Sequence, residues 1–163
     1  MARDSRLLTY REVGATTGEL PAGYRHVRES IAIGRGEDIF LAASDALMRW
    51  DVHRRAGLRV RAESPTAVPG ATVELRWCGF PIRCRVIYVL DEPDRRGFAY
   101  GTLTGHPESG EELFTVERRT DDSVHATITA FSRPGRWFTR LGDPLARAVQ
   151  HHMTRRYLRA LAC

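Results

Sequence analysis

Two residue types are missing from the chain: none of its 163 residues is a lysine or an asparagine, so all 25 basic residues are arginines. This bias is typical of proteins encoded by GC-rich genomes, and we expect a bacterial source. It also indicates that most of the arginines are solvated surface residues. The net charge of +5 nevertheless favours anionic partners, because the summed charge of a protein attracts them.

Long apolar runs are also absent. No stretch approaches the ~20 apolar residues that a membrane-spanning helix requires, and residues 1–6 lead into no signal-peptide-like segment. The cysteines Cys78, Cys84 and Cys163 form no metal-ligand pattern, and their odd number favours reduced thiols over a disulfide framework. The sequence therefore predicts a soluble cytoplasmic protein with no metal and no cofactor.

Standard catalytic motifs are missing as well. Residues 106–108 have the His-x-Glu spacing of zinc deaminases, but no Pro-Cys-x-x-Cys follows them. Gly34 and Gly36 lie between a predicted strand and a predicted helix, as in a dinucleotide fingerprint, yet Ile39 takes the third glycine position. The sequence contains no recognisable nucleic-acid-binding module, so we expect no nucleic-acid partner.

The length of the chain and its hydrophobic content of 42% are those of one globular domain. We expect residues 1–163 to form that domain, with residues 1–23 as an N-terminal arm or loop and residues 24–163 as its body.

Hydrophobic periodicity gives the element order. Alternating residues from Val27 to Ile33 predict a strand, and apolar residues at three- and four-residue intervals predict a helix over residues 37–56. Turn residues then separate six further predicted strands, at residues 58–63, 71–78, 82–90, 97–103, 111–118 and 123–132. These spacings are typical of an antiparallel meander.

The C-terminal residues predict a long helix over residues 144–162. Asp143 is suited to cap this helix and Pro144 to occupy its first turn. An apolar stripe follows one face, formed by Leu145, Ala148, Val149, Met153, Tyr157, Ala160 and Leu161. His152 and Arg156 lie on the border of the stripe, where Arg156 would either meet an anionic ligand group or reach solvent.

Residues 97–114 form the most distinctive segment, with four glycines, one histidine and three glutamates. This segment resembles the motif GTLPGHPExGEExF of the bacterial and plant family known as domain of unknown function nineteen-ninety. The segments at residues 8–16, 20–24 and 33–36 resemble other blocks of the same family. Thr104 is a departure, because it stands where the family motif has proline, but it removes no ionisable group.

The element order, together with this resemblance, implies an α+β helix-grip fold, similar to the START and Bet v 1 superfamily. In such a fold, a curved antiparallel sheet of about seven strands packs around a long C-terminal helix. A strongly curved sheet cannot touch a straight helix along its whole length, so a tapering cavity remains between them.

The candidate site residues fall into two sets. His106 is the candidate acid or base, since an unperturbed histidine titrates near ~6.5, and Glu108, Glu111 or Glu112 would orient it. The same residues would equally stabilise the loop without any chemistry. The candidate ligand contacts are Trp77, Tyr88, Tyr100, His106, His152 and Arg156, although aromatic residues at such positions are also typical of a plain core.

Three functions remain open. The favoured hypothesis is a protein that binds a small apolar or amphipathic ligand, with an anionic end held by His152 and Arg156. The second is an enzyme that uses His106 with a neighbouring glutamate. The third is an interaction module whose arginines bind an acidic partner, with the arginine- and aromatic-rich residues 131–140 as a contact.

Overall fold

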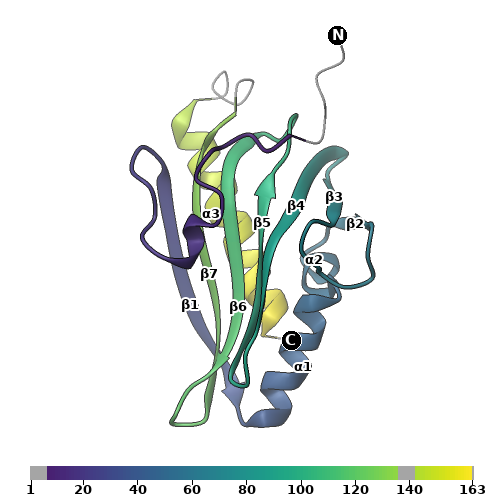
Figure 1. Cartoon of the computed structure of the whole chain (residues 1–163), viewed down its shortest axis with the longest axis vertical. Coiled ribbons are helices and arrows are strands. Elements are labelled where there is room, and N and C mark those ends of the chain that lie inside the picture. The colour runs from purple at the N-terminus through teal and green to yellow at the C-terminus, as the bar shows by residue number, and fades with distance from the viewer. Residues whose placement is uncertain (1–6, 136–141, 163) are drawn as a thin grey trace.

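The structure is a computed structural model that describes residues 7–135 and 142–162. Its seven strands form one sheet in the order β1-β7-β6-β5-β4-β3-β2, and all neighbouring strands are antiparallel. The strands are β1 (Arg25–Arg35), β2 (Arg59–Ala62), β3 (Thr72–Trp77), β4 (Phe80–Asp91), β5 (Arg95–Thr102), β6 (Glu108–Arg118) and β7 (Ser123–Pro134). The helices are η1 (Ala15–Thr17), α1 (Glu37–Met48), α2 (Asp51–Arg55) and α3 (Asp143–Leu161). The predicted helix-grip fold is confirmed (Figure 1).

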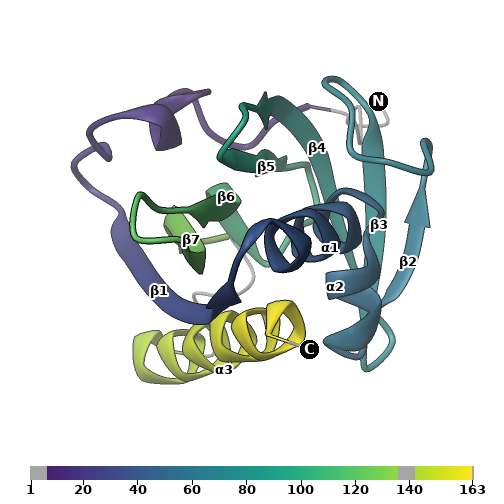
Figure 2. The same ribbon diagram turned by 90° about the horizontal axis from the view of Figure 1, so that it is seen from below.

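The sheet curves around the helices. Seen from below, the strands form an arc, with α1, α2 and α3 on its concave side and the N-terminal segment on its outer side (Figure 2). Strand alternation sends Phe114 and Val116 of β6 and Ile128 of β7 into the core between the sheet and the helices, where each is fully buried. The concave side therefore carries the hydrophobic core.

The predicted helix over residues 37–56 is wrong in one respect, because the chain breaks it at Trp50. This residue has a left-handed backbone, with φ 67°, between α1 and α2. Its indole ring is buried 5.0 Å from the ring of Phe98, and its Nε1 donates a hydrogen bond to the Ser64 carbonyl. Burial of this large ring outweighs the continuous helical pattern of the sequence.

Helix α3 lies where it was expected, with two corrections. Gly142, rather than Asp143, is the N-cap residue, with φ 81°. Tyr157 and Leu161 are buried against the core as predicted, but Leu145 is 50% exposed. Ala146 in the same turn is buried, whereas Ala148 of the predicted stripe is exposed, so the N-terminal part of α3 buries a different side than its sequence pattern suggests.

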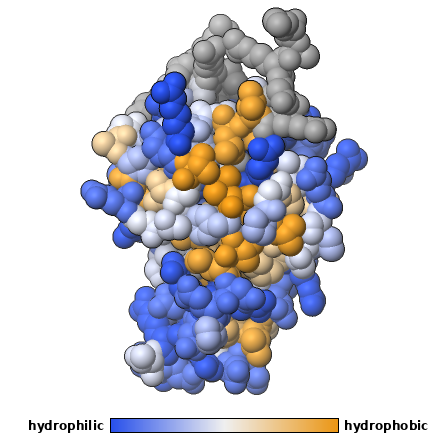
Figure 3. Space-filling model, viewed as in Figure 1, coloured by the Kyte–Doolittle hydropathy of each residue, from blue (hydrophilic) through white to orange (hydrophobic). Residues whose placement is uncertain are grey.

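The N-terminal segment crosses the outer face of the sheet. Leu8 forms a β-bridge with Leu103, and the Thr9 amide donates a hydrogen bond to the Thr102 carbonyl. The same face is displayed in Figure 3, where hydrophobic residues gather in its middle and hydrophilic residues fill most of its lower half. The arm is therefore an ordered layer on the sheet.

Two glycines of the family-like segment have different structural roles. Gly105 has φ 93°, a backbone conformation that side chains with a Cβ rarely adopt. Gly101 is constrained by space, because a Cβ there would lie 2.1 Å from the Tyr10 hydroxyl. Gly101 thus leaves room for the arm to reach β6.

Candidate functional site

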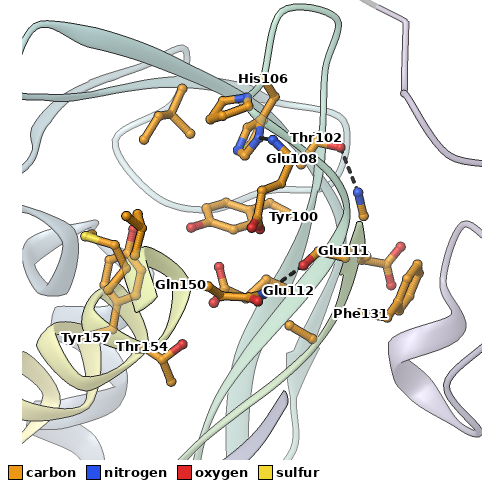
Figure 4. A pocket seen from close by; sticks show the side chains of 18 of the residues that line it. Tyr100, Thr102, His106, Glu108, Glu111, Glu112, Phe131, Gln150, Thr154 and Tyr157 are labelled. Atoms are coloured by element: carbon orange, nitrogen blue, oxygen red, sulfur yellow. Dashed lines mark hydrogen bonds between the residues drawn. The ribbon is translucent and has the colours of Figure 1, made fainter. Parts of the chain in front are cut away.

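A cavity of about 290 Å³ lies between the concave face of the sheet and α3. Its apolar walls include Trp77, Phe80, Ile82, Val149 and Met153. Its polar part is formed by Tyr100, Thr102, His106, Glu108, Glu112, Ser132, Gln150, Thr154 and Tyr157, most of which are labelled in Figure 4. Five strands, α3 and the loop after β5 contribute residues to this one space.

Strand β6 separates the three glutamates that the sequence placed together. Successive side chains of a strand point to opposite faces, so Glu108 and Glu112 share the cavity side with core residue Phe114. Glu111 borders the cavity, but its carboxylate points away from it, toward the N-terminal segment (Figure 4).

The Glu111 carboxylate anchors the arm. One carboxylate oxygen accepts hydrogen bonds from the Tyr10 hydroxyl at 2.6 Å and the Gly14 amide at 2.8 Å. The other accepts hydrogen bonds from the amide and the hydroxyl of Thr16. The hypothesis that Glu111 assists His106 therefore needs correcting, because this side chain joins two family-like segments on the outer face.

Glu112 is the most perturbed carboxyl group of the cavity. Burial raises its pKa to about 8, and repulsion from Glu108 adds to this effect, whereas a hydrogen bond with Tyr100 opposes it. Burial also raises the pKa of the Tyr100 and Tyr157 hydroxyls, which interact with each other. Near neutral pH, Glu112 therefore holds a proton within a group of uncharged hydroxyls.

The ionised form of Glu108 is stabilised by more neighbouring groups than that of Glu112. Burial raises its pKa, but a hydrogen bond with Ser132 and the positive charge of Arg25 both act in the opposite direction. The Ser132 hydroxyl also accepts a hydrogen bond of 2.7 Å from Nε2 of Gln150 on α3. A chain of polar contacts thus links α3 to the carboxylate of Glu108 across the cavity.

His106 is held in its neutral form. Its Nδ1 accepts a hydrogen bond of 2.9 Å from the Glu108 amide, which places the ring proton on Nε2. Burial lowers the pKa of His106 to about 4. A histidine in this state is a hydrogen-bond donor to the cavity and a poor base at neutral pH, since its Nδ1 lone pair is already occupied.

The predicted ligand contacts divide between the cavity and other places. Trp77, Tyr100 and His106 line the cavity, whereas Tyr88, His152 and Arg156 are not among its lining residues. The Tyr88 hydroxyl lies 2.7 Å from the Thr16 hydroxyl under the N-terminal arm, on the outer side of the sheet.

His152 and Arg156 lie outside the cavity because of the rotation of α3. His152 is exposed, with its ring 6.5 Å from that of Trp77. The Arg156 guanidinium lies beside Gly57, where a Cβ would be 2.6 Å from Nη2. The helix turns Met153, Thr154 and Tyr157 toward the cavity instead.

Sequence reasoning missed Gln150, Thr154 and Ser132. Gln150 and Thr154 are one turn apart and share a helical face with Tyr157, so the periodicity of α3 groups them together but does not indicate that this face lines the cavity. Ser132 had no local signal, because its contact with Gln150 joins elements that are distant in sequence. The predicted contact segment at residues 131–140 falls in part on residues 136–141, outside the described residues.

His53 of α2 was not identified from the sequence either. Its ring is fully buried among aromatic rings, and neither ring nitrogen has a hydrogen-bond partner within the described part of the chain. The surrounding rings are those of Trp50, Phe98, Tyr100, Phe114 and Tyr157. Burial lowers the pKa of His53 to about 3, so the core contains an uncharged imidazole directly behind two cavity tyrosines.

This histidine gives a testable pH dependence. Its folded-state pKa lies below its unfolded value, so the stability that it contributes is present above about pH 6.5 and is lost as the pH falls toward 3. When the pH is lowered from 6.5 to 5.0, the free energy of unfolding measured by urea denaturation should fall by about 2 kcal/mol less for His53→Leu than for the wild type. The exposed His152→Leu is the control and should keep the wild-type loss. Equal losses in all three proteins would contradict the buried neutral state.

Residues 7–135 and 142–162 contain neither a membrane-spanning helix nor a metal-binding cluster. No described helix is long and apolar enough to cross a membrane. No group of three or more His, Cys, Asp or Glu side chains in these ranges could hold a metal ion.

Solved structures share the fold at low sequence identity. A hypothetical protein from Helicobacter pylori superposes with a TM-score of 0.66 at 11% identity, over 85% of this chain and 86% of that chain. A norcoclaurine synthase point mutant from Thalictrum flavum, determined with a transition state analogue, superposes with a TM-score of 0.57 at 11% identity, over 88% and 97% of the two chains. The fold is therefore Bet v 1-like.

Sequence relatives occur in bacteria and eukaryotes, so family membership does not indicate the expected bacterial source. A UPF0548 protein of Deinococcus radiodurans is 36% identical over 94% of this chain and 85% of its own length. A UPF0548 protein of Arabidopsis thaliana is 29% identical over 77% of this chain and 65% of its own length. Residues 9–160 match the family described as "Domain of unknown function (DUF1990)". The chain belongs to this family, as its 97–114 segment predicted.

Proposed function

We propose that the protein binds a small, largely apolar molecule in the cavity between the sheet and α3. The observation that carries this proposal is a space of about 290 Å³ with apolar walls and one concentrated polar region. Ligand sites are typically concave and apolar, with a few polar groups that fix the orientation of the ligand, and volumes of roughly 300–1,000 Å³ are common. The cavity is close to the lower limit of this range, which favours a ligand with two or three rings.

The polar end of the ligand faces carboxyl groups rather than arginines. His152 and Arg156, the predicted anchors for an anionic end, lie outside the cavity, whereas Glu108 and Glu112 line it. A carboxylate or phosphate ligand would lie against these acidic side chains, and no arginine is among the described lining residues to pair with it. We therefore replace the anionic ligand of the sequence-based hypothesis with a neutral or cationic one.

The arginine-rich interaction module has weaker support than the cavity. Several surface arginines form ion pairs with neighbouring carboxylates, including Arg54 with Asp51, Arg83 with Glu74, and Arg96 with Asp45. These pairs neutralise the arginines locally, which is the ordinary role of such residues on a solvated surface.

Acid–base catalysis is a second candidate, because the pKa of Glu112 is raised to about 8. A carboxyl group that titrates near neutral pH is suited to exchange a proton with a bound molecule. Glu112, rather than His106, is then the acid or base, since Nδ1 of His106 already accepts a backbone hydrogen bond. A turnover rate that changes with an apparent pKa near 8, and is abolished in Glu112→Gln, would establish this activity.

The binding proposal is tested with N-phenyl-1-naphthylamine, an uncharged apolar dye that fluoresces in apolar surroundings. Wild-type protein should bind it saturably with one site per chain. Ala130 lines the cavity and is buried on β7, so Ala130→Phe should fill the space and weaken dye binding by at least about tenfold, or about 1.4 kcal/mol.

Two further variants make this test decisive. Val149→Phe fills the cavity from α3, which avoids reliance on a single variant that could fail to fold. Ala32→Phe adds the same ring at an exposed position of β1 and should leave binding unchanged. Circular dichroism confirms that each variant is folded. Unchanged dye binding in both folded cavity variants would contradict the proposal.

A further inference from the structure

The charge of the cavity is opposite to that of the whole protein. The chain has 25 arginines and a net charge of +5, yet none of the lining residues that the structure describes is an arginine. The ionisable side chains in the polar region are instead two glutamates, two tyrosines and one neutral histidine. We propose that the ligand carries a basic nitrogen, and that this cation lies against Glu112 with Glu108 beside it. This inference rests on the proposed function and specifies the class of ligand.

Glu108 and Glu112 differ in whether a positive charge lies near the carboxyl group. Glu108 has a hydrogen bond with Ser132 and the positive charge of Arg25 nearby. The interactions that act on Glu112 are burial, repulsion from Glu108 and a hydrogen bond with Tyr100, and none of them comes from a cation. A buried carboxylate without a cation is costly, so a ligand ammonium group would supply the partner that Glu112 lacks.

The ionisable groups that interact with Glu112 come from four elements, whereas β7 presents Ala130 opposite it. They are Tyr100 on β5, Cys84 on β4, Glu108 on β6 and Tyr157 on α3. Burial raises the pKa of the Cys84 thiol and of both tyrosine hydroxyls, so these three groups are uncharged near neutral pH. None of the four carries a positive charge, and the hydrogen bond with Tyr100 only partly offsets the effect of burial on Glu112.

The apolar walls specify the rest of the ligand. Trp77, Phe80, Ile82 and Met153 line the same cavity as the carboxyl groups. An aromatic ring packs well against such side chains, and the faces of Tyr100 and Tyr157 add attraction for a cation. The ligand class that matches both ends is a small arylalkylamine.

Binding of such an amine is coupled to release of a proton. Glu112 holds a proton near pH 7, because its pKa is about 8. An ammonium group favours the ionised carboxylate, so complex formation at pH 7 should release a number of protons that approaches one. Amine affinity should rise by roughly 10–50-fold from pH 6 to pH 8 as Glu112 ionises.

Three ligands with the same ring system separate the alternatives. They are 2-(1-naphthyl)ethylamine, 2-(1-naphthyl)ethanol and 1-naphthylacetate, which are cationic, neutral and anionic at pH 7. We expect calorimetry to give an amine affinity at least about tenfold higher than that of the alcohol, with the acetate weakest. Titrations in two buffers of different ionisation enthalpy measure the released proton.

Variants assign the preference to Glu112. Glu112→Gln should lower amine affinity to the level of the alcohol, abolish proton release and preserve binding of the alcohol. Glu117→Gln is the matched control, because Glu117 is on the same strand but is not a cavity residue. This control should retain the full amine preference.

The outcomes distinguish this inference from the function on which it rests. If the alcohol binds as tightly as the amine, or if Glu112→Gln keeps the amine preference, the basic nitrogen is excluded and the binding proposal survives. Alcohol binding that weakens from pH 6 to pH 8 would assign Glu112 as a proton donor to a neutral ligand, which also overturns the inference. If neither the three ligands nor the dye bind, both proposals fail.

Discussion

Replacing Glu112 with glutamine is expected to raise the free energy of unfolding at pH 7 by about 3 kcal/mol. The folded-state pKa of Glu112, about 8, is higher than the ordinary value of 4.5 for a glutamate. A group of this kind contributes stability that is fully present below about pH 4.5 and is lost as the pH rises to 8. Glutamine keeps a hydrogen-bonding side chain of similar size and removes this dependence.

Urea denaturation and thermal unfolding at pH 4.5 and pH 7 test this prediction. The variant and the wild type should have similar stability at pH 4.5, whereas at pH 7 the variant should melt roughly 6–12 °C higher, since 1 kcal/mol shifts the melting temperature of a chain of this length by about 2–4 °C. Glu117→Gln, on the same strand outside the cavity, should show no such gain. A Glu112→Gln variant that is no more stable than wild type at pH 7 would contradict the buried, unmatched carboxyl group.

Replacing Glu111 with alanine is expected to have the opposite effect and to destabilise the protein by about 3–5 kcal/mol. The carboxylate accepts hydrogen bonds from Tyr10, Gly14 and Thr16, and its removal leaves their donors without a partner beneath the arm. Tyr10→Phe removes only one of these bonds and should cost about 1–2 kcal/mol.

Hydrogen exchange locates the effect of Glu111→Ala. The amides of Gly14 and Thr16 should lose protection first, because both donate directly to the carboxylate. A loss of less than about 1 kcal/mol, the scale of an ordinary surface change, would show that Glu111 does not anchor the arm. Two adjacent glutamates thus have opposite predicted effects, because β6 directs them to opposite faces of the sheet.

The element order of the fold could be predicted from the sequence because it depends on local patterns. Alternation from Val27 to Ile33 corresponds to β1, and the stripe that contains Met153 and Tyr157 corresponds to α3. The break at Trp50 could not be predicted from local pattern, because the position of its ring depends on Phe98, a residue of β5 that is distant in sequence.

The candidate site could be predicted in part. The segment that contains His106, Glu108 and Glu112 does contribute to the cavity. The sequence analysis did not predict which of its glutamates face the cavity, because the predicted strand began at residue 111, whereas β6 begins at Glu108. Had the strand been extended by three residues, alternation would have placed Glu108 with Glu112 and Glu111 on the opposite face.

The cavity-facing side of α3 could not be obtained from its sequence. His152 and Arg156 border the apolar stripe as closely as Gln150 and Thr154 do. A helix's rotation about its own axis is set by packing against partners that are distant in sequence. The same reason applies to Tyr88, whose hydroxyl is near Thr16 of the N-terminal arm rather than in the cavity.

The central claim, that a small molecule occupies the cavity, is tested most directly by NMR of protein labelled with ¹³C at its methionine methyl groups. The chain has three methionines. Met153 lines the cavity, whereas Met48 packs against the core outside it and provides an internal control. During titration with N-phenyl-1-naphthylamine, we predict a saturable shift of the Met153 resonance with little change at Met48. A Met153 resonance that does not move while dye fluorescence saturates would place the dye elsewhere and contradict the account.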